Sequence, residues 1–150
     1  YIDKLIYISA FIPNKNGSLI EEEQKAKFPS VTSYINVNTD NCLLDRQKAV
    51  KDLFYQHCDE RDINLALSKI QDQPLLPFVE KVSLGDNFDG LYKVYIECLK
   101  DNAINIAEQR RMNNICNKVI SIDTDHSPFF SSPDELVSIL DEENDYDNQG

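Results

Sequence analysis

The sequence lacks the features that bind membranes and nucleic acids. It contains no apolar run of about 18 residues, the length that a membrane-spanning helix requires. Basic side chains are scarce, because 15 Lys and Arg stand against 26 Asp and Glu and give a net charge of −11. Anionic lipids and nucleic-acid backbones attract clusters of Lys and Arg. We therefore expect neither a membrane nor a nucleic acid as a partner.

Closely spaced metal ligands are also missing. The cysteines at positions 42, 58, 98 and 116 form no C-x-x-C pair, and the two histidines, His57 and His126, lie far apart in the sequence. A structural zinc site needs ligands in close pairs. We expect no metal and no other cofactor, and His57 is expected to be a partly exposed helical residue. Reduced, mostly structural thiols are typical of a cytoplasmic protein, which is the localisation that we expect.

The remaining composition is typical of one folded domain with an acidic end. A chain of 150 residues, 41% hydrophobic and 27% charged, is long enough for one core. The last ten residues, DEENDYDNQG, carry five acids and predict a solvated, disordered tail over 141–150. The only methionine is Met112, and the first residues are already strand-like. We expect the chain to be a piece of a longer protein, with a processed N-terminus as the alternative.

The order of the predicted elements is characteristic of an α/β fold. The pattern predicts a buried strand over 4–12, a weak helix over 20–28, a short strand or hairpin over 30–39, and helices over 45–58 and 60–70. A clearer unit follows, with strands over 93–100 and 118–123 and helices over 105–116 and 132–143. Ser132, Pro133 and Glu135 are suited to the N-cap, N1 and N3 positions of the last helix. Strand, helix and strand in about 30 residues predict parallel pairing.

The stretch VISIDTDHSPFF, residues 119–130, places a histidine just after a predicted strand. Parallel strands of one crossover unit end at the same edge of the sheet, where ligands bind in open sheets. Asp101 and His126 follow the two strands of this unit, so we expect their side chains to come within hydrogen-bond reach. An aspartate that accepts from a histidine ring fixes its tautomer and stabilises the imidazolium. A surface or capping histidine is the alternative that the spacing leaves open.

Two other acids compete with Asp101 for the histidine ring. Asp125 is adjacent to His126, so its side chain is expected to diverge from the ring. Asp123 is expected to accept hydrogen bonds from backbone N–H groups of the turn, as aspartates commonly do.

Three separated segments resemble the α/β-hydrolase superfamily: KLIYISAFIPNKNGSL, VYIECLKDNAI with EQRRM after it, and IDTDHSPFFSSPDEL. The resemblance is to the branch of plant methylesterases and hydroxynitrile lyases and their bacterial relatives. It implies the C-terminal half of that fold, with the last strands of a parallel sheet and their crossover helices. The parts are a core strand over 1–13, a helical cap or lid insertion over 14–82 (the cap segment), and a βαβα core over 83–140.

The resemblance also implies the roles of two residues. Asp101 corresponds to the acid and His126 to the base of a Ser-Asp-His triad, in the family's chain order. The nucleophile elbow, G-x-S-x-G, does not occur in the sequence, and the family places it and the oxyanion hole before the first strand. Ser9 lacks a glycine-flanked turn and Ser127 adjoins the base, so neither is expected to be the nucleophile.

The resemblance implies an apolar pocket beneath the cap segment. The candidate pocket residues are Phe11, Phe54, Tyr55, Phe78 and Phe129, with core packing as the alternative for each. We expect hydrolysis of a small-molecule carboxylic ester, with little or no activity in the isolated chain. Ser127 stands where the lyase branch carries a lysine, which favours ester hydrolysis over cyanohydrin cleavage. The alternative is a truncated, non-catalytic binding or interaction domain that associates through the exposed edge of its first strand.

Overall fold

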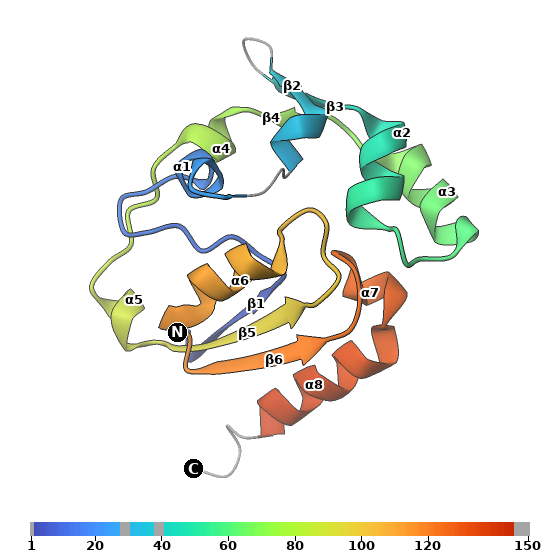
Figure 1. Ribbon diagram of the computed structural model, residues 1–150. Coiled ribbons are helices and arrows are strands. Elements are labelled where there is room, and N and C mark those ends of the chain that lie inside the picture. The colour runs from blue at the N-terminus through green and yellow to red at the C-terminus, as the bar shows by residue number, and fades with distance from the viewer. Residues whose placement is uncertain (1, 28–30, 38–40, 146–150) are drawn as a thin grey trace.

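A three-stranded parallel sheet forms the centre of the molecule. The computed structural model describes residues 2–27, 31–37 and 41–145 (Figure 1). The strands are β1 (Lys4–Ile8), β5 (Tyr92–Cys98) and β6 (Lys118–Ile122), in the order β1-β5-β6. Both pairings are parallel, with Ile8 opposite Ile96 and Cys98 opposite Ile122. The prediction of parallel pairing is confirmed.

Helices cover the two faces of this sheet. Helix α6 (Ile106–Met112) continues into η3 (Asn113–Ile115), and helix α8 is Pro133–Asp145. Side chains alternate along β5: Tyr95 packs with Met112 on the α6 face, and Ile96 packs with Leu136 on the α8 face. Tyr95 and Ile96 are fully buried, as expected for a strand covered on both faces. The result is a helix–sheet–helix sandwich that presents the loops after β5 and β6 at one edge.

The cap segment contains both helices and a second sheet. Its strands β2 (Ile35–Val37), β3 (Asn41–Leu44) and β4 (Gln73–Pro74) form an antiparallel sheet in that order, so the cap segment, expected to be helical with a short strand or hairpin over 30–39, also contains a three-stranded sheet. Pairing of β3 with β4 is non-local, which a scan of local periodicity cannot detect. The other elements are α1 (Leu19–Gln24), η1 (Val31–Tyr34), α2 (Arg46–Ala49), η2 (Val50–Phe54), α3 (Glu60–Lys69) and α4 (Leu76–Val79).

The predicted helix over 45–58 is shorter and changes its winding. Asp45 caps α2 by accepting from the N–H of Lys48, and the π-helical turn η2 ends at Phe54. His57 is therefore exposed in a turn rather than helical, which corrects that expectation. Figure 1 shows α2 and α3 beside the loops that follow β5 and β6. Two short helices, α5 (Asn87–Gly90) and α7 (Pro128–Ser131), complete the core part of the chain.

The first strand is shorter and less buried than predicted. It ends at Ile8, because Ser9 has a φ of 38° in the left-handed region that a serine rarely adopts. Ile6 is exposed, since β1 pairs with β5 alone among the described strands. The backbone N–H of Ser9 donates to Ile96, so by alternation the peptide groups of Ile6 and Ile8 face the opposite edge.

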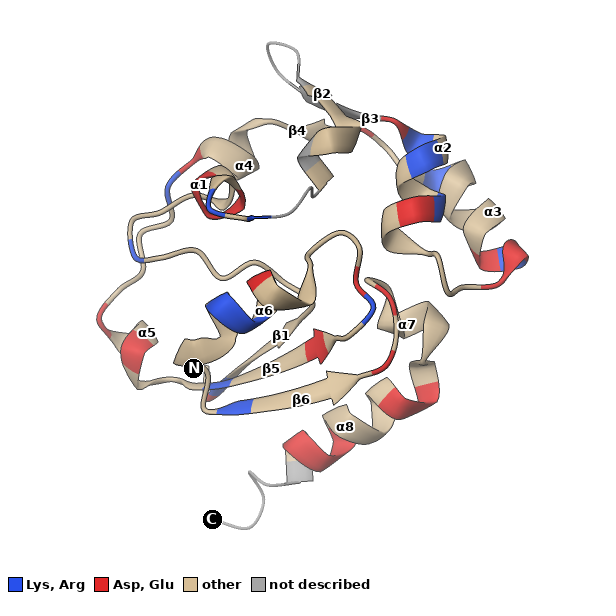
Figure 2. Cartoon of the chain, in the orientation of Figure 1, with Lys and Arg blue, Asp and Glu red and all other residues tan. Residues whose placement is uncertain are grey.

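The acidic end is partly ordered. Helix α8 extends through Asp145, so residues 141–145 of the predicted tail are helical, and 146–150 lie outside the described residues. Figure 2 shows the acids along α8, whose last turn carries no basic residue. Acids at a helix C-terminus are unfavourable. The buried Glu143 is compensated by ion pairs with Lys4 and Lys118. In the described part of the chain, no helix is long and apolar enough to cross a membrane.

Candidate functional site

The carboxylate of Asp101 is held in one orientation by its local sequence. It follows β5 after a two-residue turn, and its Oδ1 accepts from the backbone N–H groups of Ala103 (2.7 Å) and Ile104 (2.9 Å). An aspartate commonly accepts in this way from N–H groups two and three residues later. The side chain is fully buried, so these bonds also replace the water that the carboxylate loses. Oδ2 is thereby directed away from the turn.

Asp101 and His126 form a direct hydrogen bond. Nδ1 of His126 lies 2.8 Å from Oδ2 of Asp101, as the sequence analysis expected for these two loops. An ionised carboxylate is only an acceptor, so Nδ1 carries the hydrogen and the neutral ring keeps its lone pair on Nε2. The His126 side chain is about a quarter exposed, which leaves the ring accessible on one side. This arrangement suits a general base.

Gln109 of α6 also holds the carboxylate of Asp101 in place. Its amide nitrogen donates to Oδ2 of Asp101 (3.2 Å) and to the carbonyls of Cys98 and Ile104. Its amide oxygen accepts from the N–H of Cys98. Gln109 has no exposed surface. Gln109 was not among the predicted site residues, although a glutamine on the core-facing side of the helix after Asp101 is a signal present in the sequence.

Of the two neighbouring acids, Asp125 and not Asp123 accepts a hydrogen bond from the backbone of the turn. Asp125 diverges from the ring as expected, but it is Asp125, with no exposed surface, that accepts from the backbone of the turn, through the N–H of Ser127 (3.0 Å). Asp123 is exposed and pairs with Lys100 at 2.8 Å, so its expected role in the turn was wrong. A side chain pointing outward from the end of β6 meets solvent and cannot reach the turn.

An apolar cavity of about 250 Å³ lies beside His126. Of the five candidate pocket residues, the structure places Phe11, Phe54 and Phe78 in its lining. Tyr55 instead packs on Phe130, and Phe129 is half exposed, so these two lie outside the cavity lining. The rest of the lining is Ser9, Ala10, Leu19, Val31, Ala103, Ile104 and His126. A wall of this composition suits the uncharged, apolar part of a ligand.

No described hydrogen bond joins the hydroxyl of either serine near the histidine to its ring. The hydroxyl of Ser9 donates to the backbone carbonyl of His126 (3.3 Å) and contacts Sγ of Cys98 (3.5 Å). Ser127 is buried and its N–H is engaged by Asp125. The strained φ of Ser9 could not be anticipated from its sequence neighbours, because no glycine marks the position. Both hydroxyls are therefore unsuited to act as a nucleophile for His126.

The cysteine thiols near the site stay protonated. Burial raises the pKa of Cys98 to about 11, and the carboxylate of Asp101 adds to this effect. Burial and the carboxylate of Asp125 raise the pKa of Cys58 to about 12. Cys58, Cys98 and Cys116 are free cysteines. The described residues contain no group of three or more His, Cys, Asp or Glu side chains that suits a metal ion.

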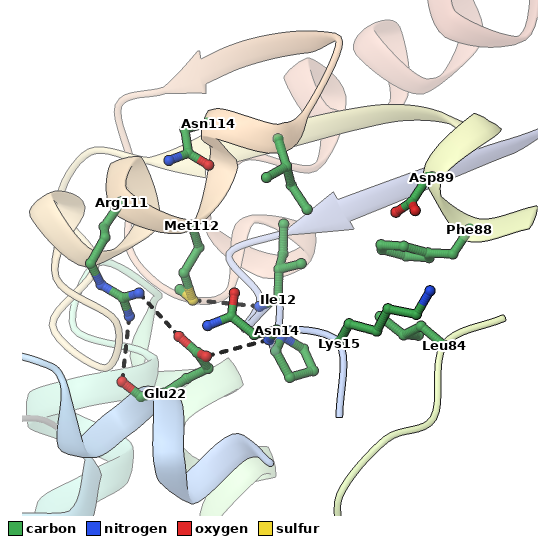
Figure 3. Close-up of a pocket in the computed structure, with 12 residues that line it drawn as sticks. Ile12, Asn14, Lys15, Glu22, Leu84, Phe88, Asp89, Arg111, Met112 and Asn114 are labelled. Atoms are coloured by element: carbon green, nitrogen blue, oxygen red, sulfur yellow. Dashed lines mark hydrogen bonds and ion pairs between the residues drawn. The ribbon is translucent and has the colours of Figure 1, made fainter. Parts of the chain in front are cut away.

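A second cleft, of about 370 Å³, lies on the α6 side of the sheet (Figure 3). In its lining, Arg111 donates to Glu22 (3.0 Å), and it also donates to Glu108 (2.7 Å) next to the cleft. Glu22 also accepts from the backbone N–H of Asn14, and its side chain is buried. These bonds join α1 to α6. Their function is to fix the cap segment against the core.

Comparisons with known proteins agree with this architecture. No protein-family model matches the chain. A chloroplast-designated protein of Arabidopsis thaliana, named provisionally as methylesterase 11, is 38% identical over 102 residues, which are 65% of this chain and 26% of that protein. Methylesterase 18 of the same plant is 26% identical over 129 residues, which are 83% of this chain and 49% of that protein. The chain thus spans between a quarter and a half of these relatives.

Solved structures show the same fold at low sequence identity. Polyneuridine aldehyde esterase superposes with a TM-score of 0.77 at 22% identity, over 95% of this chain and 62% of that one. A pyrethroid hydrolase from Sphingobium faniae gives 0.79 at 22% identity, over 93% of this chain and 60% of that one. The expected resemblance is confirmed, and this chain has the fold of part of an α/β-hydrolase.

Proposed function

We propose that this chain supplies the acid, the base and the cap of a serine carboxylic ester hydrolase. The observation that carries the proposal is the 2.8 Å hydrogen bond between Asp101 and His126 beside an apolar cavity. The similarity to methylesterases supports an ester as the substrate class. Residues outside this chain would provide the serine and the oxyanion hole, because the sequence has no G-x-S-x-G.

The proposed mechanism follows from the state of the His126 ring. Nε2 takes the proton of the serine hydroxyl as its oxygen attacks the ester carbonyl, and Asp101 stabilises the imidazolium that forms. The tetrahedral intermediate collapses, and the same proton passes to the leaving alcohol. Water then attacks the acyl-serine with His126 as the base again, which releases the acid and restores the serine. The apolar cavity would bind the uncharged part of the ester.

The unpaired side of β1 is the proposed attachment point for the segment that bears the serine. Its outward peptide groups, at Ile6 and Ile8, would extend the parallel sheet by one strand. That strand would end beside Ser9, at the same edge as Asp101 and His126. The serine would then reach Nε2 of His126.

Two measurements test the proposed function. The coding sequence upstream of Tyr1 should contain a G-x-S-x-G within roughly 30 residues, between a strand and a helix. A fluorophosphonate probe, which labels activated serines, should label that serine in the polypeptide that contains it and fail to label it in the His126→Ala variant. An upstream stop codon, or labelling that persists without His126, would contradict the proposal and leave a non-catalytic binding domain.

A further inference from the structure

One stretch of the cap segment contacts the loop that carries Asp101. The side-chain amide of Asn102 donates to the carbonyl of Asp52 (2.8 Å). The side-chain amide of Gln56 donates to the carbonyl of Lys100 (2.7 Å). The residues on both sides of Asp101 are thus tied to the end of η2 and the turn after it.

The same stretch contacts the loop that carries His126, through the buried carboxylate of Asp125. Oδ2 of Asp125 accepts from the backbone N–H of His57 (2.8 Å) and lies 3.7 Å from Sγ of Cys58. Oδ1 accepts from the N–H of Ser127 (3.0 Å) and the hydroxyl of Ser131 (2.7 Å). One oxygen therefore binds the cap segment and the other binds the turn that holds the base.

Aromatic contacts also join the cap segment to the loop that carries His126 and to α7. The ring of Phe54 packs on the ring of His126, with centroids 5.4 Å apart, and Tyr55 packs on Phe130 at 5.7 Å. Phe54 also lines the apolar cavity. A cap stretch held by Asp125 thus places one wall of the cavity against the face of the base.

We propose that Asp125 is a positioning residue that locks the cap segment to the His126 turn and thereby sets the hydrogen bond between His126 and Asp101. The proposal rests on the proposed function of that pair. Without the carboxylate, His57 N–H and Ser127 N–H lose their common acceptor, and the loop after β6 loses this hydrogen bond to the cap segment. The ring of His126 is then free to leave Asp101.

A purely structural role of Asp125 and a positioning role predict different effects of its removal. A buried acceptor of several hydrogen bonds stabilises any fold, so its removal lowers the melting temperature whether or not it positions a base. A positioning role predicts in addition a local change at a ring that Asp125 does not itself touch. The hydrogen on Nδ1 of His126 reports that change, because its proton resonance moves far downfield when it is bonded to a carboxylate.

The experiment is proton NMR of the ¹⁵N-labelled chain, with variants of the two acids that flank Thr124. The downfield Nδ1–H signal should be present in the parent chain, lost in Asp125→Ala and weakened in Asp125→Asn. The matched control is Asp123→Ala, which removes a negative charge two residues away and should keep the signal, because Asp123 is exposed and pairs with Lys100. Melting curves show which variants are folded.

The outcomes separate this inference from the proposed function. Loss of the signal in Asp101→Asn identifies it as the Asp101–His126 bond, and its survival there would overturn that pair as acid and base. An unchanged signal in a folded Asp125→Ala or Asp125→Asn chain would overturn the positioning role and leave the pair intact. In an assembled enzyme, Asp125→Asn should lower kcat about 10- to 100-fold with little change in KM, since small misplacement of a base has costs of this size.

If the Asp125 variants do not fold, hydrogen exchange of the unsubstituted chain tests the positioning role of Asp125 instead. The positioning role predicts that His57 N–H, Ser127 N–H and His126 Nδ1–H share one free energy of opening, once each exchange rate is divided by the intrinsic rate of that N–H group, because one opening of the Asp125 contacts exposes all three. A free energy of opening for the His126 proton unrelated to that of the two backbone protons would contradict the inference.

Discussion

Asp101 and His126 are 25 residues apart in sequence, and their side chains meet at 2.8 Å because two parallel strands end side by side. The acid is immobilised by Ala103, Ile104 and Gln109, whereas the base keeps about a quarter of its side chain exposed. A fixed acid and an accessible base are what proton transfer to an incoming group requires. The catalytic proposal depends on this difference between the partners.

If the proposed ester hydrolysis holds, the cavity beside His126 should determine which acyl chains are accepted. Replacing Phe78 by Ala removes an aromatic wall and should shift the preference towards esters with longer acyl chains. We expect the ratio of kcat/KM for long and short p-nitrophenyl esters to change by about tenfold or more, the effect of a few methylene groups in an apolar pocket.

The matched control for the cavity is Phe129→Ala. Phe129 is 53% exposed and lies outside the cavity lining, so the same truncation there should leave the chain-length preference unchanged. An equal shift in both variants would show that the cavity does not bind the acyl group.

Acid should unfold the protein in part through Glu97. Burial raises the pKa of this carboxyl, but hydrogen bonds from Arg110, Ser121 and Asn113 outweigh burial and hold the pKa below its ordinary value. A carboxyl with a lowered pKa in the folded state stabilises the fold above its unfolded pKa, and that stability is lost as the pH falls through the folded pKa.

The measurement is urea unfolding between pH 7 and pH 3. The free energy of unfolding should fall below about pH 4.5 in the parent chain, near the ordinary carboxyl pKa. The fall should be shallower in Glu97→Gln, which has no proton to gain. Glu80→Gln, at an exposed residue after the end of α4, should reproduce the parent curve. Identical slopes for all three chains would contradict the assigned role of Glu97.

The central α/β unit could be predicted because its signals are local. Tyr95 and Ile96 lie in a mostly apolar stretch over 91–99 that only Lys93 and Glu97 interrupt, and a strand–helix–strand order predicts parallel pairing. These two facts bring Asp101 and His126 to one edge. The expected ends of the strands and helices were accurate to a few residues, and β1 ends at Ile8 rather than at residue 12 because Ser9 turns the chain in a conformation that its neighbours do not encode.

The contacts around the pair could not be predicted in the same way. Asp125 finds its partner in the backbone of His57, across the boundary between core and cap segment, and backbone groups carry no sequence signal. The resemblance made Tyr55, in the cap segment, and Phe129, beside the base, candidates for the pocket, but their directions depend on the turns that carry them. The pairing of β3 with β4 is likewise non-local and includes Pro74, a residue that sequence rules assign to breaks.

The thiol of Cys58 should react slowly although it is partly exposed. With its pKa raised to about 12 by burial and by Asp125, only a minute fraction is thiolate at pH 8. Alkylation by iodoacetamide should therefore be slower than in the urea-unfolded chain by about a thousandfold, the ratio of the thiolate fractions. Peptide mass spectrometry assigns the rate to Cys58, and a rate near that of the unfolded chain would contradict the raised pKa.

The most direct test of the account is the turnover of a p-nitrophenyl ester by this chain joined to the serine-bearing segment that the proposed function requires. Asp101→Asn and His126→Ala should each lower kcat by about 10⁴-fold or more, because one turns the ring to the wrong tautomer and the other removes the base. The Asp123→Ala variant should retain the parent rate. Turnover within a few-fold of the parent in either Asp101→Asn or His126→Ala would contradict the assignment of this pair as acid and base.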